Sequence, residues 1–534
     1  MNQAKNVDAV VVGAGFAGLY ALHRLRALGL NVQVFEAGSD VGGTWFWNRY
    51  PGARCDVDSH DYSFSFSEEL QQEWRWPERF SNQSEILRYI HHVADRFGLR
   101  PGVKLDTRVT AMHYDDTVGR WTVKTDQGDE VTARFCVMAS GQLSLPSVPD
   151  FPGLESFKGK WYHSGKWPHE TVDFTGQRVG VIGTGSSGIQ IIPLVAQEAK
   201  HLHVFQRTAN YCIPAMNRPL TDEADQERKG NYKAMREVAA ASAFCMTAGA
   251  PPLKSALEDT PEQREKVYES KWNAGGSINF LYAYRNLLVD KAGNDTAGDF
   301  VRAKIRSTVK DPKVAALLSP KGYYIGTKRL CLGTNYYETY NRDNVTLVDV
   351  RSSPIERITP TGVKTHDAEY ELDTLVFATG FDAMTGPMLD IDIRGRDGLA
   401  LSKKWAEGPR SFLGLMTAQF PNLFIITGPG SPSVKTNMVC HIEQHVDWIT
   451  DCIGHLVQAG IRTIETPRDK EDTWVRHVNE VGDATLYPLA DSWYTGANIP
   501  GKPRVFMPYV GGMDKYKAFC DRETETRYQS FVLS

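Results

Sequence analysis

The stretch of sequence that decides the fold is Asp8-Ala9-Val10-Val11-Val12-Gly13-Ala14-Gly15-Phe16-Ala17-Gly18. Its first part is a short apolar run of the kind that parallel sheets bury, and three glycines follow in the pattern GxGxxG. Gly13 permits a tight turn, Gly15 lets the backbone approach a pyrophosphate, and Gly18 lets a helix pack closely on a strand. The stretch therefore predicts a strand, a phosphate-binding turn and the start of a helix.

The residues after this turn complete a nucleotide-binding unit. Leucines recur at helical spacing from Leu19 to Leu28, and the pattern stops at Gly29. A second strand, residues 31–35, ends at Glu36, which is placed to accept hydrogen bonds from a ribose. Strand, helix, second strand and acid together predict a dinucleotide site.

A second copy of this unit begins at residue 178. The strand Val179-Gly180-Val181-Ile182 leads into Gly183-Thr184-Gly185-Ser186-Ser187-Gly188 and a helix that starts with Ile189-Gln190. The position that corresponds to Glu36 is Gln206, and Arg207 and Thr208 follow it. A neutral residue next to an arginine favours a ribose that carries a 2′-phosphate, which indicates NADP. Alternatively, Arg207 is a solvated residue at the end of a strand.

Two dinucleotide sites in one chain imply a redox relay, with FAD in the first site and NADPH in the second as hydride donor. The fold class predicted is α/β, with two Rossmann-like dinucleotide-binding domains and a helical insertion. We expect the FAD domain at 1–140 and 385–534, a linker at 141–150, the NADP domain at 151–215 and 325–380, and the insertion at 216–324. The insertion is rich in Ala, Glu, Lys and Arg with helical periodicity.

Composition excludes several classes. The 60 Lys and Arg against 64 Asp and Glu give a formal charge of −4, which argues against a nucleic-acid partner. No apolar run reaches the length of a membrane span, and the first residues lack the features of a signal peptide. The 8 Cys show no CxxC or CxxxxC spacing, so we expect reduced thiols, a cytoplasmic protein, no metal site and no disulfide reductase.

Two further stretches resemble the signatures of one enzyme family. Residues 42–56, Gly-Gly-Thr-Trp-Phe-Trp-Asn-Arg-Tyr-Pro-Gly-Ala-Arg-Cys-Asp, resemble the flavin-side signature of type I Baeyer–Villiger monooxygenases. Residues 157–168 match the family's FxGxxxHxxxWP signature, and the final Trp167-Pro168 pair favours this branch over N- and S-monooxygenases. We read His163, within this signature, as a structural hydrogen-bonding residue of the linker.

The resemblance implies a reaction and a catalytic pair. NADPH reduces FAD, O2 then gives a C4a-peroxyflavin, and this species attacks a ketone to give an ester or lactone. The family uses an arginine as the cation beside the flavin, and Arg329 matches it. Asp56 matches the carboxylate that orients this arginine.

The same resemblance implies the cofactor contacts. Lys328, Arg207 and Thr208 match the positions that hold the 2′-phosphate, and Trp493 matches one near the nicotinamide ribose. For Val109 and Met438, plain core packing explains the residue nearly as well. The full set of expected cofactor contacts is Gly13, Gly15, Ala17, Gly18, Glu36, Thr44, Trp45, Phe46, Trp47, Arg54, Cys55, Asp56, Tyr62, Val109, Gly183, Gly185, Ser186, Ser187, Gly188, Ile189, Gln190, Arg207, Thr208, Lys328, Arg329, Met438 and Trp493.

Two alternatives stay open at this point. A heteroatom (S or N) monooxygenase would use the same oxygenated flavin without needing the Arg–Asp pair, and an NADPH oxidase would lack the oxygenation step. The Gly/Pro/Ser-rich segment 428–437 is expected to be a mobile loop at the substrate pocket. The expected partners are a small ketone and O2, with no membrane contact, and the chain is expected to be a monomer or weak oligomer.

Overall fold

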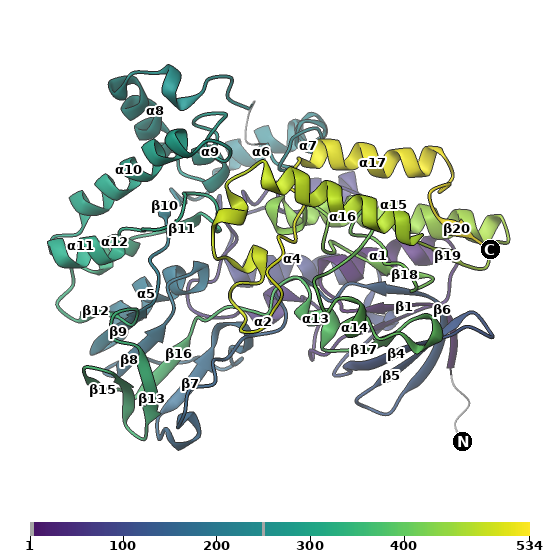
Figure 1. Cartoon of the computed structure of the whole chain (residues 1–534), viewed down its shortest axis with the longest axis horizontal. Helices are drawn as coiled ribbons and strands as arrows, with labels where there is room; N and C mark the ends of the chain where they lie inside the picture. The colour runs from purple at the N-terminus through teal and green to yellow at the C-terminus, as the bar shows by residue number, and fades with distance from the viewer. Residues whose placement is uncertain (1–4, 248–250) are drawn as a thin grey trace.

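Two β-sheets, each beside a glycine-rich turn, organise the chain (Figure 1). They are seen in a computed structural model that describes residues 5–247 and 251–534. The first sheet has eight strands, in the order β17-β4-β5-β6-β1-β2-β3, with β18 also paired to β6. Its strands are β1 (Lys5–Val12), β2 (Val32–Phe35), β3 (Val103–Lys104), β4 (Val109–Asp115), β5 (Arg120–Thr125), β6 (Glu130–Met138), β17 (Asp392–Arg394) and β18 (Leu423–Ile425).

The decisive stretch lies at the centre of this sheet. β1 is parallel to both β6 and β2, and its register pairs Val12 with Phe35. The helix α1 (Phe16–Ala27) follows directly, and Gly13 donates its N–H to the Phe35 carbonyl at 2.8 Å. The predicted strand, turn, helix and second strand are confirmed.

The second sheet is parallel throughout, in the order β12-β9-β8-β16-β7. The predicted second unit is present as β8, α5 (Ser186–Glu198) and β9. A strand from much later in the chain, β16, lies between β8 and β7. The strands are β7 (Lys160–His163), β8 (Arg178–Ile182), β9 (His201–Gln206), β12 (Val345–Asp349) and β16 (Thr374–Phe377). The α/β class with two Rossmann-like units is thus confirmed.

Helices fill the segment between β10 (Cys212–Pro214) and β11 (Cys331–Gly333), as its periodicity predicts. The helices of residues 261–318 gather at one end of the molecule, beyond the second sheet, and those of residues 222–240 lie nearer its middle (Figure 1). The apolar faces of the helices in 261–318 pack on the core of that sheet, which includes Ile189 and Ile213, whereas Arg236, from the helices in 222–240, donates to the Ser63 hydroxyl at 2.7 Å. The helices are α6 (Asp222–Gly230), α7 (Tyr232–Ala240), α8 (Pro261–Ala274), α9 (Ser277–Leu281), α10 (Lys291–Thr308) and α11 (Pro312–Leu318).

The last part of the chain covers the first sheet. α15 (Met438–Gln458) packs against α1, and the Tyr20 hydroxyl donates to the Asp447 carboxylate at 2.7 Å. α15, α16 and α17 lie side by side above β1 and β6 in Figure 1. The remaining helices and strands are α2 (Thr44–Trp47), α3 (Glu68–Glu73), α4 (Gln83–Arg96), α12 (Tyr336–Thr339), α13 (Gly386–Leu389), α14 (Leu401–Lys404), α16 (Arg468–Asp483), α17 (Met513–Glu525), β13 (Ile355–Thr359), β14 (Gly362–Thr365), β15 (Glu369–Glu371), β19 (Ile464–Glu465) and β20 (Val532–Leu533).

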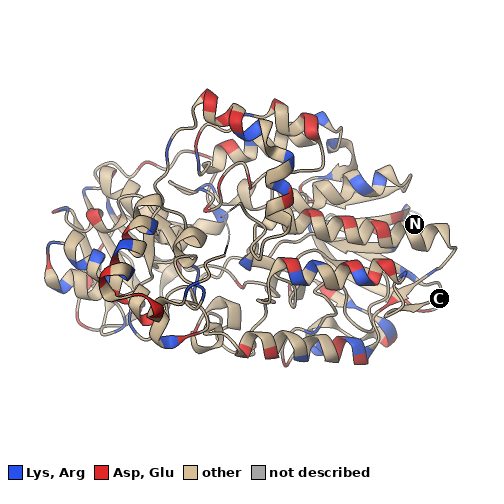
Figure 2. Cartoon of the chain, turned by 90° about the horizontal axis from the view of Figure 1, so that it is seen from above, with Lys and Arg blue, Asp and Glu red and all other residues tan. Residues whose placement is uncertain are grey.

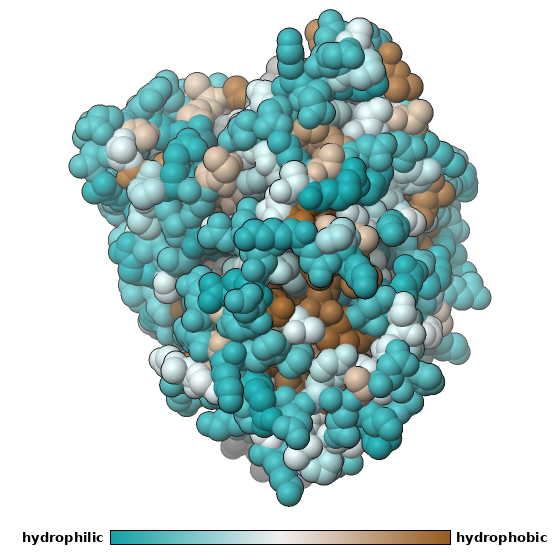
Figure 3. All heavy atoms as spheres, turned by 90° about the vertical axis from the view of Figure 1, so that its left-hand side faces the viewer, coloured by the Kyte–Doolittle hydropathy of each residue, from teal (hydrophilic) through white to brown (hydrophobic). Residues whose placement is uncertain are grey.

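The surface carries both signs of charge. Acidic and basic residues are interspersed along the outer helices (Figure 2). The face in Figure 3 is mostly hydrophilic, with an apolar area in a hollow near its middle. Within the described ranges, no helix is both long and apolar enough to cross a membrane.

The expectation that all cysteines are reduced thiols is wrong for two of them. Cys245 and Cys440 form a disulfide, with their Cα atoms 6.2 Å apart. Cys440 lies in the first turn of α15, and the segment that follows α7 folds back onto it, so that the Asn437 N–H donates to the Phe244 carbonyl. The two cysteines are 195 residues apart, so no local spacing could predict the pair. The six other cysteines are free and buried.

His163 ties the segment after β7 to the strand next to it. Its Nδ1 accepts the Gly165 N–H at 2.9 Å, and its Nε2 lies 3.3 Å from the Thr379 hydroxyl. The side chain is buried, and burial lowers its pKa from 6.5 to about 4. These contacts agree with the structural role that we read from the sequence.

The buried His163 predicts a loss of stability in acid. The unfolded histidine binds a proton below pH 6.5 but the folded one only below about 4, so the stabilisation is present at neutral pH and is lost between these values. At pH 5 the loss is about 1–2 kcal/mol. We expect His163→Asn, which keeps an acceptor for Gly165, to be less acid-sensitive than the parent between pH 7 and 5 in thermal unfolding. The exposed His366→Asn is the control, and an unchanged pH slope in His163→Asn would contradict the prediction.

Candidate functional site

The first glycine turn leaves no room for side chains. Gly13 has a φ of +102°, and a Cβ there would lie 2.5 Å from the Ala139 carbonyl oxygen. A Cβ on Gly18 would lie 1.8 Å from the Gly13 carbonyl oxygen, because α1 begins against the end of β1. No side chain caps the first turn of α1, so its backbone N–H groups are free to bind an anion. The turn fits a pyrophosphate.

Glu36 stands at the end of β2, beside this turn. Its carboxylate is buried and accepts the N–H groups of Ala14 and Gly38, each at 2.7 Å. Burial raises the pKa of Glu36, and the two backbone hydrogen bonds oppose the shift. Each carboxylate oxygen keeps a lone pair for a ribose hydroxyl, so the residue fits the predicted role.

The second turn repeats this geometry. Gly183 has a φ of +110°, and a Cβ on Gly188 would lie 2.2 Å from the Gly183 carbonyl oxygen. A Cβ on Gly185 would meet open space, which leaves room for a phosphate above the uncapped start of α5. Gln206 donates to the Leu317 carbonyl at 2.9 Å, while its own Oε1 is buried with no partner among the described residues. An unpaired acceptor at this position suits a ribose hydroxyl.

Three basic residues meet at the end of the second sheet. Lys328 packs its ammonium 4.6 Å from the centre of the Tyr323 ring. Burial lowers the pKa of Lys328, and the nearby cations Arg207 and Arg351 lower it further, while Asp491 opposes them. Such a cluster suits a doubly charged phosphate.

Arg351 was missed from the sequence. It follows β12, and Asp349 of that strand pairs in register with Gln206 of β9. Because neighbouring parallel strands end at the same edge, a strand assignment for 345–349 would have placed Arg351 beside Arg207.

The candidate catalytic pair is formed. Arg329 donates from Nε to Asp56 Oδ2 at 2.7 Å and from Nη2 to Asp56 Oδ1 at 2.6 Å. Its Nη1 donates to the Val434 carbonyl at 3.0 Å. Burial opposes the charge of Arg329, but the attraction and hydrogen bonds of Asp56 outweigh it and raise the pKa of Arg329 above its usual range. The guanidinium is therefore a fixed cation.

The loop that carries Asp56 is docked on α5. A Cβ on Gly52 would lie 2.6 Å from the Gln190 carbonyl oxygen, so this loop and the helix touch through backbone. The Tyr50 hydroxyl donates to the Gln190 side chain at 2.9 Å, and Gln190 donates in turn to the Arg54 carbonyl at 3.1 Å. The pair thus lies at the junction of the two glycine-turn units.

Residues of the flavin-side signature form a largely aromatic wall. Trp45, in α2, donates from its ring nitrogen to the Tyr62 hydroxyl at 3.2 Å, and Phe46 packs edge-on against Trp47. Cys55 is a buried thiol whose pKa is raised, first by burial and then by Asp56.

The other expected contact residues have varied environments. The Arg54 guanidinium binds Glu78 and the Phe80 carbonyl, at 3.0 and 2.6 Å. Val109 is buried in a core of the first sheet and Ile189 in that of the second, which fits a role in packing. Thr44, Ser186 and Arg207 are exposed, and Ala17, Ser187, Thr208, Met438 and Trp493 are half-buried. Their contacts with cofactors remain predictions.

The segment 428–437 was expected from its composition to be a mobile loop at the substrate pocket. Nearly all of it is buried, and residues 433–435 form a turn of 3₁₀ helix. Asn437 donates to the Asp61 carbonyl at 2.6 Å, and Arg329 binds the Val434 carbonyl at 3.0 Å. Hydrogen bonds from distant parts of the chain hold this segment in place. The local composition does not reveal such bonds.

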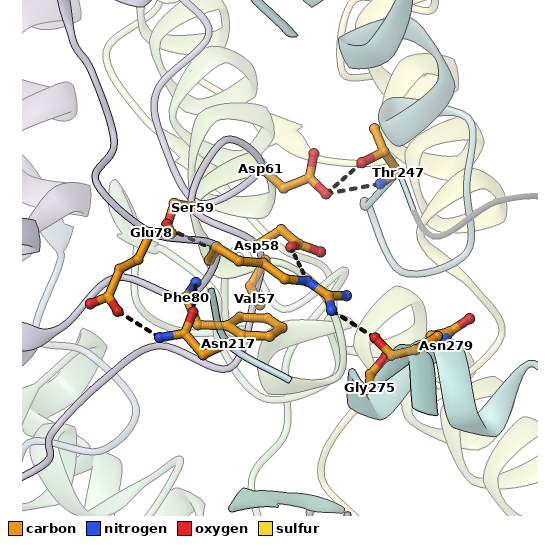
Figure 4. A network of polar contacts seen from close by, with 12 residues as sticks. Val57, Asp58, Ser59, Asp61, Glu78, Phe80, Asn217, Thr247, Gly275 and Asn279 are labelled. Atoms are coloured by element: carbon orange, nitrogen blue, oxygen red, sulfur yellow. Dashed lines mark hydrogen bonds and ion pairs between the residues drawn. The ribbon is translucent and has the colours of Figure 1, made fainter. Parts of the chain in front are cut away.

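A cavity of about 990 Å³ lies apart from this pair, and none of the residues expected from the sequence to form the site lines it. Part of its wall is a polar network that joins the segment 58–80 to the helical insertion (Figure 4). Arg79 donates to Asp58 at 2.8 Å and to the Ala274 carbonyl at 2.8 Å. Of the arginines that line this cavity, Arg79 is already bound to other residues and Arg218 is exposed.

Comparisons with known proteins give a consistent result. The model of the flavin-binding monooxygenase-like family matches residues 4–219. The chain is 45% identical to a Baeyer–Villiger monooxygenase of Pseudooceanicola batsensis, over 98% of this chain and 96% of that protein. It is 40% identical to a phenazine N-monooxygenase of Lysobacter antibioticus, over 100% of this chain and 98% of that one. The solved structure of an oxidized steroid monooxygenase bound to NADP superposes with a TM-score of 0.95 at 52% identity, covering 99% of both chains.

The first glycine turn predicts a sharp effect of one methyl group. Gly18→Ala forces the side chain into the Gly13 carbonyl, so we expect protein that lacks flavin or does not fold. Gly454→Ala in α15 is the matched control, since its Cβ would meet Leu28 at 3.5 Å, an ordinary contact. For each variant, the flavin absorbance per protein measures the bound flavin, and the melting temperature measures the stability of the fold. Normal flavin content in Gly18→Ala would contradict the prediction.

Proposed function

The chain belongs to the Baeyer–Villiger monooxygenases, and from this premise we propose that Arg329 and Asp56 form its catalytic pair. The enzyme inserts one oxygen atom of O2 next to a ketone carbonyl to give an ester or lactone, with FAD and NADPH as cofactors. The observation that carries the proposal is the two-pronged ion pair between residues 273 positions apart. It joins the loop docked on α5 to the segment that leads into β11.

The cofactors, when bound, supply the hydride, the activation of O2 and the oxygen that is inserted. Arg329 supplies a permanent positive charge where negative charge develops on the attacked carbonyl oxygen. Asp56 uses both of its oxygens to fix the plane of the guanidinium, and the Val434 carbonyl holds the opposite edge. An arginine oriented in this way stabilises the charge without having to reorganise.

An apolar cluster borders the pair on one side, while the Arg329 and Asp56 side chains themselves are 30% and 24% exposed. Ala383, Met384, Val434, Tyr487 and Tyr494 are buried in one apolar cluster. Where water is excluded, the interaction of Arg329 with an oxyanion is stronger and a reactive oxygen species is protected from loss.

We also propose a role for each sheet. The uncapped α1 and Glu36 support FAD at the first, and Gln206, Arg207, Thr208, Lys328 and Arg351 support NADP at the second. The domain limits given above, 1–140 with 385–534 and 151–215 with 325–380, follow from that assignment.

Two finer points are part of the proposal. We propose that the substrate is a small ketone and that the chain works in the cytoplasm as a monomer or weak oligomer. Its mixed surface charges and net charge of −4 support a free protein rather than one bound to a polyanion. Sedimentation of the FAD-loaded enzyme tests the oligomeric state.

A second candidate is heteroatom oxygenation. The 40% identical relative named as a phenazine N-monooxygenase favours it. Attack by a nitrogen or sulfur atom creates no carbonyl oxyanion, so it would not need the Arg–Asp pair. The arginine therefore separates the two candidates.

Arg329→Ala is expected to keep FAD and its anaerobic reduction by NADPH while losing ester formation by about a hundredfold or more, because the oxyanion loses its cation. Gas chromatography measures the ester from phenylacetone, and flavin bleaching measures reduction. Arg178→Ala is the matched control, since it also removes a two-pronged pair, with Asp373, but at the surface. Ester formation retained in Arg329→Ala would contradict the role, and oxidation of an amine or sulfide alone by the parent would favour the second candidate.

The basic cluster predicts the choice of nicotinamide cofactor. Lys328→Gln and Arg351→Gln should each raise the KM for NADPH about tenfold, since each removes a charged hydrogen bond to the 2′-phosphate. The KM for NADH should change little. The exposed Arg357→Gln, on β13, serves as control. Equal effects on both cofactors would show that the cluster does not hold the 2′-phosphate.

A further inference from the structure

Lys435 is a cation beside the candidate catalytic pair that the reaction described above does not use. It ends the 3₁₀ turn of residues 433–435, one residue after Val434, whose carbonyl binds Arg329. The turn is held, because the Lys435 N–H donates to the Pro432 carbonyl at 3.0 Å and the Thr436 hydroxyl donates to the Ser433 carbonyl at 3.0 Å. The start of the side chain is therefore fixed next to the site.

The Lys435 ammonium is held between two aromatic rings. It lies 4.0 Å from the centre of the Tyr487 ring and 4.4 Å from that of Tyr494. Both tyrosines are buried, and Tyr494 is fully so. Two ring faces stabilise a cation.

No carboxylate of the described residues forms an ion pair with Lys435. The charged group whose field acts on it is Arg329, another cation, and burial and Arg329 together lower the pKa of Lys435 well below its usual value. By contrast, Arg329 itself is neutralised by Asp56. Lys435 is half-buried, and an ammonium partly removed from water without an anion is costly, so this site gains stability from any ligand that brings a negative charge.

A further polar atom points to a ligand. The Tyr494 hydroxyl is buried and has no hydrogen-bond partner among the described residues. This hydroxyl belongs to a ring that the Lys435 ammonium contacts, and a carboxylate has the lone pairs to accept from both groups. The surrounding side chains, Met384, Val434 and Phe506, are apolar and suit the alkyl chain of a ligand.

We propose that this enzyme takes ketones that carry a carboxylate, and that Lys435 binds this carboxylate while Arg329 faces the carbonyl group. The inference rests on the proposed function of Arg329 and adds a substrate class to it. Lys435 is thus a specificity-determining residue. The anionic groups of the dinucleotides have their own sites, at the uncapped starts of α1 and α5 and at the cluster of Arg207, Lys328 and Arg351.

The test compares keto acids with neutral ketones of equal size. The acids run from 4-oxopentanoate to 7-oxooctanoate, and each is matched by a methyl ketone of the same chain length, such as 2-octanone for 7-oxooctanoate. Each acid gives an acetoxy acid by insertion of one oxygen atom, while NADPH is oxidised and the other oxygen atom leaves as water. We expect at least one acid to have a higher kcat/KM than its matched ketone in the parent enzyme.

Lys435→Met keeps an unbranched side chain one atom shorter and removes the charge. It should lower kcat/KM for the preferred acid by about tenfold to a hundredfold, the size expected for one hydrogen bond between charged groups. The value for the neutral ketone should change less than about threefold, within the range of an uncharged contact. Lys435→Arg should restore part of the preference, and Lys403→Met, an exposed lysine of α14, is the matched control.

A binding measurement separates substrate recognition from catalysis. Octanoate and octanamide are titrated into the enzyme loaded with FAD and NADP+, and the flavin absorbance and melting temperature are followed. Octanoate should bind the parent more tightly than octanamide, and Lys435→Met should remove the difference.

Three results would overturn the proposal. The first is an equal kcat/KM for each acid and its matched ketone in the parent enzyme, and the second is an unchanged acid preference in Lys435→Met. The third is a raised KM for NADPH in that variant, which would assign Lys435 to the cofactor. Ester formation from neutral ketones in each case shows that the proposed function still holds. If the parent enzyme formed no ester from any ketone, the proposed function itself would be overturned.

Discussion

The ion pair between Arg329 and Asp56 is the interaction on which the site depends. Its two short hydrogen bonds join a loop of the first unit to the segment that leads from the helical insertion into β11. Such a pair tolerates little displacement, because two parallel N–H···O bonds require a common plane. The two sheets must therefore be held in a fixed relation near this point.

Backbone contacts at glycines provide that relation. Within each unit, the helix approaches the preceding strand so closely that a Cβ at Gly18 or Gly188 would overlap a carbonyl oxygen. Between the units, a Cβ at Gly52 would likewise overlap the Gln190 carbonyl oxygen. The GxGxxG turns thus act as packing elements as well as phosphate sites, and Gly52 carries the same kind of contact to the loop of Asp56.

Local sequence explains most of the fold and part of the site. The two glycine turns, their strands and the insertion were predictable because each depends on neighbours in the chain. Asp56 and Arg329 could be named by resemblance, but their contact joins residues 273 positions apart. Arg351, the Cys245–Cys440 disulfide and the buried state of 428–437 were missed for the same reason. Each arises from strands or helices that meet only in the folded chain, and composition suggested the opposite for the segment 428–437.

The parts of the site differ in whether their cations are paired with a carboxylate. This difference matches the charge of the ligand that each part is proposed to bind. Arg329 is paired with Asp56, so the centre is close to neutral and suits an uncharged carbonyl that becomes negative only as the reaction proceeds. Arg207, Lys328 and Arg351 gather without an ion pair to any carboxylate of the described residues, although Asp491 acts on Lys328 from a distance, and this suits a ligand that is charged from the start. Lys435 follows the second pattern although it lies next to the first. A substrate with a neutral carbonyl at one end and an anion at the other satisfies both, since burial penalises each unpaired charge whichever molecule carries its partner.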